Sequence, residues 1–229
     1  SEQVADVVCV LRCVPPSMRT TNEFLWPESG PVECPDWQPH AECGNGLHGR
    51  LWGEGDLSAS GGVWEMPDAK WLVVCVAKKD VVELGGKVKY PRGEVVFCGT
   101  REAAANKICE LGASGSVHFA TRAAGNYGTA TAGYSGTATA GDSGTATAGD
   151  SGTATAGYSG TATAGNYGTA TAGYSGTATA GNLGTVAIRW YDAKQERYRL
   201  AIGEVGIDGI AANVAYVVRD GKIARRDPA

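Results

Sequence analysis

The sequence predicts a mainly β protein, with a small α+β N-terminal domain, a flat two-sheet β-solenoid of 16-residue coils and a C-terminal β cap. Three observations lead to this fold class. An eight-residue unit, Gly-Thr-Ala-Thr-Ala-Gly plus a variable pair, occurs seven times in succession over residues 128–183. Threonine and alanine alternate strictly inside each unit. The 34 glycines of the 229-residue chain are unevenly distributed, and two of them flank each variable pair.

The alternation and the glycines predict short strands joined by tight turns. Threonine is β-branched and favours extended backbone, and an alternation with a period of two is typical of a strand. The Gly-x-x-Gly segments between the strands contain Asn, Asp and Ser, which favour turns. A flexible linker is the alternative interpretation, but Gly/Ser linkers lack such regular β-branched positions.

The regularity of the repeat also indicates how the strands are wound. An antiparallel meander would place Thr opposite Ala, whereas a solenoid stacks Thr on Thr and Ala on Ala. The sequence favours the solenoid, with two units per coil because one unit is too short to close a coil. We expect alanine inside and threonine outside, since buried hydroxyls without partners cost about 1–3 kcal/mol each.

The outward threonines and three tyrosines at the turns form the expected interaction surface. They are Thr129, Thr131, Thr137, Thr139, Thr145, Thr147, Thr153, Thr155, Thr161, Thr163, Tyr134, Tyr158 and Tyr174.

The expected domains are residues 1–112, 113–185 and 186–229. Apolar runs predict N-terminal strands at 7–11, 71–76, 81–84 and 94–97, and cap strands at 186–191, 198–202 and 215–218. A helix is expected over 101–111, with Thr100 as its N-cap. Asp220-Gly221 is a typical hairpin turn.

The N-terminal domain resembles an uncharacterised domain family of bacteria and their phages. The resemblance lies in WPESGPVE at 26–33, CGNGLHG at 43–49, WGEGD at 52–56 and DAKWLVV at 68–74. In that family the domain precedes similar Gly-Thr-Ala-Thr-Ala-Gly arrays. The resemblance implies this architecture and no established activity.

A second resemblance concerns a possible enzyme. Residues 44–48 (GNGLH), an apolar strand and then residues 94–97 (EVVF) are similar to the strand order of ADP-ribosyltransferase-like folds. This order would imply NAD chemistry, but His48 stands where those enzymes usually carry Tyr, and residues 7–14 lack their early His. The catalytic candidates are His48, Glu54 and Glu94, with His48 as acid or base. The alternative is a histidine that fixes a loop by hydrogen bonding.

The seven cysteines leave a zinc site and buried thiols as interpretations. Cys9, Cys13, Cys34, His40 and Cys43 lack the short paired spacings of zinc sites. We therefore expect no metal and no cofactor, and thiols that pack as small hydrophobes or include one disulfide. Reduced thiols and the lack of a visible signal segment predict a cytoplasmic protein.

Charge and hydropathy exclude two classes of partner. The formal net charge of −4 is not that of a protein held on nucleic acid by a basic field. No apolar run reaches the ~18–20 residues of a membrane span.

Three functions fit these observations. The first is a structural or interaction protein whose rigid solenoid mediates self-association, with a homodimer as the expected assembly and the chain itself as partner. The second is ice binding, because the Thr-x-Thr arrays resemble those of insect antifreeze proteins. The third is an active or degenerate ADP-ribosyltransferase-like enzyme in residues 1–112. Of these we expect the first, and no enzyme.

Overall fold

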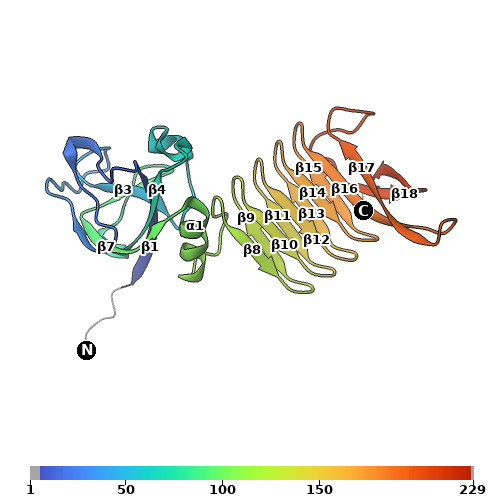
Figure 1. The fold of residues 1–229 in the computed structure, drawn as a ribbon, viewed down its shortest axis with the longest axis horizontal. Helices are drawn as coiled ribbons and strands as arrows, with labels where there is room; N and C mark the ends of the chain where they lie inside the picture. The colour runs from blue at the N-terminus through green and yellow to red at the C-terminus, as the bar shows by residue number, and fades with distance from the viewer. Residues whose placement is uncertain (1–5, 228–229) are drawn as a thin grey trace. The chain divides into compact units, whose positions relative to one another are not determined.

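The structure is a computed structural model that describes residues 6–227 of the chain. It is mostly β and divides into two compact units, Ser1–Ser114 and Gly115–Ala229 (Figure 1). Each unit has its own sheets and its own buried core.

The first unit is built on a seven-stranded antiparallel sheet in the order β2-β7-β4-β1-β3-β6-β5. The strands are β1 (Val7–Val14), β2 (Gly30–Glu33), β3 (Leu47–Leu51), β4 (Lys70–Ala77), β5 (Val82–Glu83), β6 (Val88–Tyr90) and β7 (Arg92–Gly99). Short 3-10 helices occupy Thr21–Glu23, Leu57–Ser60, Val63–Glu65 and Lys78–Asp80.

The centre of this sheet is the pair β1 and β4, which align over eight residues. Apart from Arg12 and Lys70, both strands are apolar on both faces, and most of their residues are buried. The helix α1 (Arg101–Glu110) begins at Thr100, whose hydroxyl accepts a hydrogen bond from the backbone N–H of Ala103 at 3.4 Å. α1 buries Ala104, Ala105 and Ile108. Within residues 6–227, no helix is long and apolar enough to cross a membrane.

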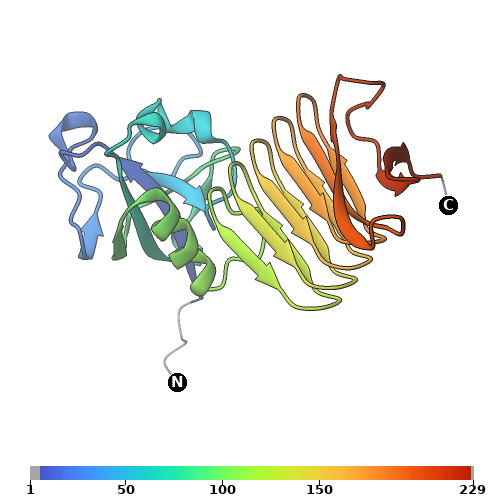
Figure 2. The same ribbon diagram turned by 45° about the vertical axis from the view of Figure 1, so that its right-hand side comes forward.

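The second unit is a β-solenoid with a β-rich C-terminal end (Figures 1 and 2). Its first sheet, called here the β10 sheet, has the order β17-β16-β14-β12-β10-β8, and its second, the β11 sheet, has the order β19-β18-β15-β13-β11-β9. The solenoid strands are β8 (Thr121–Ala124), β9 (Thr129–Ala132), β10 (Thr137–Ala140), β11 (Thr145–Ala148), β12 (Thr153–Ala156), β13 (Thr161–Ala164), β14 (Thr169–Ala172) and β15 (Thr177–Ala180). The C-terminal strands are β16 (Thr185–Asp192), β17 (Arg197–Glu204), β18 (Tyr216–Arg219) and β19 (Lys222–Arg225).

Strand pairing confirms the predicted coil of sixteen residues. β10 pairs in parallel with β12, so that Thr137 lies beside Thr153 and Ala138 beside Ala154. β11 pairs with β13 in the same way. Successive octads thus alternate between the two sheets, and the antiparallel meander is not formed.

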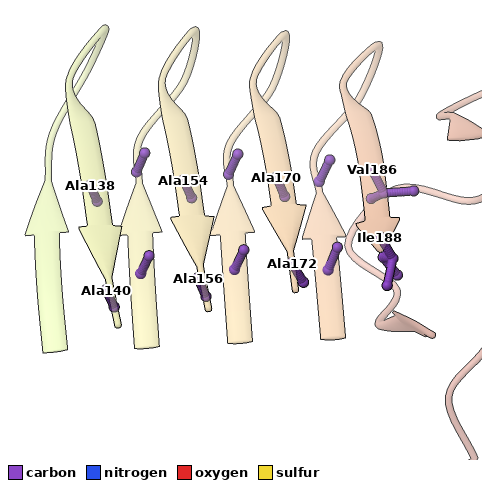
Figure 3. Close-up of a cluster of buried hydrophobic side chains, with 14 of the residues drawn as sticks. Ala138, Ala140, Ala154, Ala156, Ala170, Ala172, Val186 and Ile188 are labelled. Atoms are coloured by element: carbon purple, nitrogen blue, oxygen red, sulfur yellow. The ribbon is translucent and has the colours of Figure 1, made fainter. Parts of the chain in front are cut away.

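The core of the solenoid consists of alanine methyl groups, as predicted. The inward alanines of β9 to β15 are at most 4 % exposed. Figure 3 shows Ala138, Ala154 and Ala170 in line between the two sheets, with Val186 and Ile188 next along the stack. The larger side chains appear where the repeat ends and the cap core begins.

Both glycines of the octad are required by close contacts. A Cβ at Gly149 would lie 2.8 Å from the carbonyl carbon of Gly133, one coil away. A Cβ at Gly152 would lie 2.8 Å from the Ala148 methyl group, inside the same corner. Real Cβ atoms do not come this close to other heavy atoms, so the two corners of each octad accept only glycine.

The C-terminal strands extend both sheets and change their direction. β17 pairs antiparallel with β16 over eight residues, and β18 pairs antiparallel with β19. The β18–β19 turn is at Asp220-Gly221, both with positive φ, as the sequence predicts. Solenoid and cap belong to the same compact unit, and their division near residue 185 stays a proposal.

Candidate functional site

The outer faces of the solenoid carry two arrays of threonine. Each array has two rows, because every strand presents its first and third residues outward. On the β10 sheet the rows are Thr137, Thr153, Thr169 and Thr185, and Thr139, Thr155 and Thr171. On the β11 sheet they are Thr129, Thr145, Thr161 and Thr177, and Thr131, Thr147, Thr163 and Thr179.

The rows have regular spacings that follow from β geometry. Neighbouring threonines along a row are about 4.8 Å apart, and the two rows are about 6.6 Å apart. Threonine is restricted at χ1, so its hydroxyl and methyl group keep a defined direction. Thr129, Thr139, Thr145 and Thr153 are exposed, and the others except Thr177 are partly exposed. On the β11 sheet, the row that begins at Thr129 ends at Thr177, which is 8 % exposed and accepts a 3.5 Å hydrogen bond from Arg226 Nη1.

Side-chain oxygens at the turns align successive coils. Asp142 Oδ1 accepts a 2.8 Å hydrogen bond from the backbone N–H of Tyr158, one coil further on. Asp150 Oδ1 accepts from Asn166 N at 2.8 Å in the same manner, and Asn166 Oδ1 accepts from Asn182 N at 2.9 Å. Asp142 and Asp150 are the only charged residues of the seven octads. Both lie at turns, so the threonine rows between them carry no charge.

The three predicted tyrosines do not form one ladder. A coil has two turns, so Tyr158 and Tyr174 lie on one edge and Tyr134 on the other. Tyr158 and Tyr174 stack with ring centroids 5.8 Å apart, and Tyr174 meets the edge of Tyr198 at 5.9 Å. Tyr134 packs against Phe119, with ring centroids 5.8 Å apart.

In the first unit, His48 has the environment of a histidine that fixes a loop. Its Nε2 accepts a 3.4 Å hydrogen bond from the backbone N–H of Gly44. Burial, with Arg12 and Lys87 nearby, lowers the pKa of His48 from 6.5 to about 4. The imidazole is therefore neutral at pH 7 and acts there as an acceptor.

The three catalytic candidates do not converge. His48 lies on β3 and Glu94 on β7, with β4 and β1 between these strands in the sheet. Three strand spacings amount to about 14 Å. Glu54 lies in the turn after β3. The first unit has a cavity of about 540 Å³, but it is lined by other residues, among them Trp64, Lys70 and Arg101. The geometry therefore gives no catalytic arrangement of these three groups.

The cysteines are all free in the structure, and one pair is close. Cys9 and Cys75 lie opposite each other on β1 and β4, with their Sγ atoms 3.5 Å apart. Burial and the Cys75 thiol raise the pKa of Cys9 to about 12. Among the described residues, no group of three His, Cys, Asp or Glu side chains is placed to hold a metal ion.

Sequence comparisons add the observation that distinguishes the functional hypotheses. The relatives that the chain matches are bacterial ice nucleation proteins. One from Xanthomonas campestris pv. translucens is 36 % identical over 110 residues, which are 46 % of this chain and 7 % of the relative. A second, from Pseudomonas fluorescens, is 39 % identical over 108 residues, 46 % of this chain and 9 % of the relative. A third, from Pseudomonas syringae, is 40 % identical over 105 residues, 45 % of this chain and 9 % of the relative.

The matches cover a limited part of both partners. The chain spans a tenth or less of the length of these curated relatives. No family model matches the chain, and no solved structure matches it. The comparisons thus support a resemblance to bacterial proteins that contain repeats. They do not support the expectation of an uncharacterised family, because the matched relatives are named ice nucleation proteins and no family model matches. The ADP-ribosyltransferase resemblance receives no support from solved structures.

The expected cytoplasmic location is wrong. It conflicts with relatives that are named for ice nucleation. The expectation depended on reduced thiols and on the lack of a visible signal segment. Cys9, Cys13 and Cys34 are buried, and thiols that pack as small hydrophobes do not identify the compartment.

Proposed function

We propose that the solenoid binds ice through its threonine arrays. The observation that carries the proposal is the register of the strands, which repeats the same outward threonine in every coil. Ice is a lattice of oxygen atoms at fixed repeat distances, and only a surface with its own fixed repeat can match it over several coils. The names of the relatives point to the same function.

The chemistry of the arrays suits ordered water. Each threonine offers one hydroxyl, which donates and accepts hydrogen bonds, beside one methyl group. The absence of charge between the turns avoids the strong, differently oriented hydration shells that ionised groups hold. Because the side chains are already fixed by the strands, little conformational entropy is lost when water molecules on the rows become part of a crystal.

The comparisons favour this function over the other two hypotheses. A solenoid used chiefly for self-association remains a prediction. Two of the three tyrosines expected at its contact surface, Tyr158 and Tyr174, pack on each other, and Tyr174 also packs on Tyr198 of the same chain. An ADP-ribosyltransferase-like enzyme is not favoured, because His48 and Glu94 are separated by two intervening strands.

A pair of lysine substitutions tests the proposal. Thr145→Lys and Thr153→Lys together place one charge at the centre of each face, where both threonines are exposed. The measurement is the fraction of protein taken into a slowly growing ice hemisphere. We expect the parent to be enriched in the ice fraction and the double variant to fall to the level of a protein that does not bind ice.

The matched control moves the same charges to the edges. Ser143→Lys and Ser151→Lys lie at exposed turns, two residues before each substituted threonine. This control should enter ice as the parent does. A parent that is excluded from ice, or equal losses in the two double variants, would contradict the assignment of the binding surface to the faces.

A further inference from the structure

The strand β17 is an open, apolar edge of the β10 sheet. Within the described residues, β17 pairs with β16 on one side and with no strand on the other. Its outward side chains are Tyr198, Leu200 and Ile202, which are 51 %, 52 % and 61 % exposed. An exposed, long and apolar edge strand is a template for pairing with another strand.

The corresponding edge of the β11 sheet has the opposite character. β19 is only four residues long and includes Lys222 and Arg225. A short, charged strand is one of the means by which proteins prevent pairing at an edge. β17 has eight residues in unbroken register with β16, without bulge, proline or lysine. The difference between two edges of the same unit indicates that β17 is left open for a partner.

The charges of β17 do not oppose self-pairing. Arg197 and Arg199 lie on the side opposite Leu200. Arg197 is paired with Asp192 across the strands, and Arg199 Nη1 bonds to Asp192 Oδ2 at 3.1 Å. On the outward side, the Arg189 guanidinium lies 4.4 Å from the ring centroid of Tyr198. The outward carboxylate at the other end of the strand belongs to Glu204, which is exposed.

We propose that two copies of this chain pair their β17 strands antiparallel, about a two-fold axis perpendicular to the β10 sheet. Residues directly opposite each other in a sheet point to the same face, and side chains alternate between the faces along β17. In this self-pairing, two opposite residues must therefore both have even numbers or both have odd numbers. One such register, centred on Ala201, places Leu200 opposite Ile202 of the second copy, and this pair occurs twice. It also places Glu204 of one copy opposite Tyr198 of the other, beside Arg189. In this register the apolar row of one copy meets the apolar row of the other, and Glu204 of each copy lies near Arg189 of the other. The surface is therefore complementary to itself, which is the condition for an isologous contact.

This pairing would join the two β10 sheets into one continuous sheet. A two-fold axis perpendicular to the sheet keeps the threonine rows of both copies on the same side. The dimer contact itself does not depend on ice binding, but it would enlarge the threonine surface that the proposed function uses. Neither the threonine faces nor the turn tyrosines would be covered.

Sedimentation velocity of the full chain at about 5–200 µM tests the contact. We expect the parent to be dimeric, and Leu200→Lys with Ile202→Lys to weaken the dimer at least about tenfold. Both side chains are half exposed or more, so unchanged circular dichroism is expected for the variant. The matched control is Leu183→Lys, at a turn where the leucine is 68 % exposed, and it should sediment as the parent does.

A charge exchange tests the register. Glu204→Arg should weaken the dimer, and adding Arg189→Glu should restore it, because the two groups face each other only across the pair. A monomeric parent over the whole concentration range would overturn the proposal. So would a dimer that Leu200→Lys with Ile202→Lys leaves intact, or a double exchange that is no tighter than Glu204→Arg alone.

Discussion

At the scale of single residues, each octad contains one strained position. The second residue of every variable pair has φ between 50° and 61°, and it is serine, tyrosine or leucine rather than glycine. Residues other than Gly, Asn and Asp disfavour this left-handed region of the backbone. In five of the seven octads the backbone N–H of this residue donates to a carbonyl of the next coil, as Ser143 does to Tyr158 at 2.7 Å. The stacked coils therefore hold a conformation that a lone turn would avoid.

His48 gives a prediction for the pH dependence of the first unit. Its pKa is about 4 when folded and 6.5 in an ordinary environment, so the unfolded chain binds more protons between these values. Stability should be complete above pH ~6.5 and should fall as the pH approaches 4, by about 1–2 kcal/mol after allowance for solvent screening. Urea unfolding of the first unit, followed by tryptophan fluorescence, measures this loss.

Two variants isolate the contribution of His48 to that slope. His48→Gln should flatten the pH dependence between 4 and 6.5, whereas His40→Gln, at an exposed position, should leave it unchanged. A slope that persists in His48→Gln would mean that other groups cause it.

At the scale of elements, the solenoid could be predicted closely and the first unit only in part. An even period with Thr and Ala in alternation determines which side chains face outward in every strand, so strand, register and core followed from the sequence. The apolar runs did not predict the strands β2, β3 and β6, and only the resemblance to ADP-ribosyltransferase-like folds indicated a strand near β3, at residues 44–48. These three strands contain residues such as Pro31, His48 and Gly49 that show no alternation, and they exist because distant strands pair with them. The open edge at β17 was also missed, although residues 198–202 were expected to form a strand.

The thin core gives a prediction about packing. Ala154→Val should lower the free energy of unfolding by about 1–3 kcal/mol, because Ala154 is fully buried between two sheets separated by methyl groups. Thr153→Val, on the neighbouring exposed residue, should change it by no more than about 0.5 kcal/mol. Thermal melts followed by circular dichroism compare the two. Equal shifts, or a larger shift for the threonine variant, would mean that the faces are assigned backwards.

At the scale of the whole molecule, the proposed ice binding would depend on the length of the threonine rows. A single coil offers two threonines per face, and two hydroxyl groups are too few to form a repeat that could match the spacing of an ice lattice. About four coils in register offer a surface on which the same hydrogen-bonding group recurs at a constant interval. The strength of ice binding should therefore increase with the number of coils.

Changing the number of coils tests this claim most directly. Deleting residues 145–160 removes one complete coil and leaves Gly144 joined to Thr161, so that the remaining octads keep their register. Inserting a second copy of the same segment adds one coil. The measurement is the fraction of each protein taken into a growing ice hemisphere, with circular dichroism to establish that all three chains are folded. We predict that this fraction rises from the shortened chain through the parent to the lengthened chain, and equal fractions in all three folded chains would contradict the account.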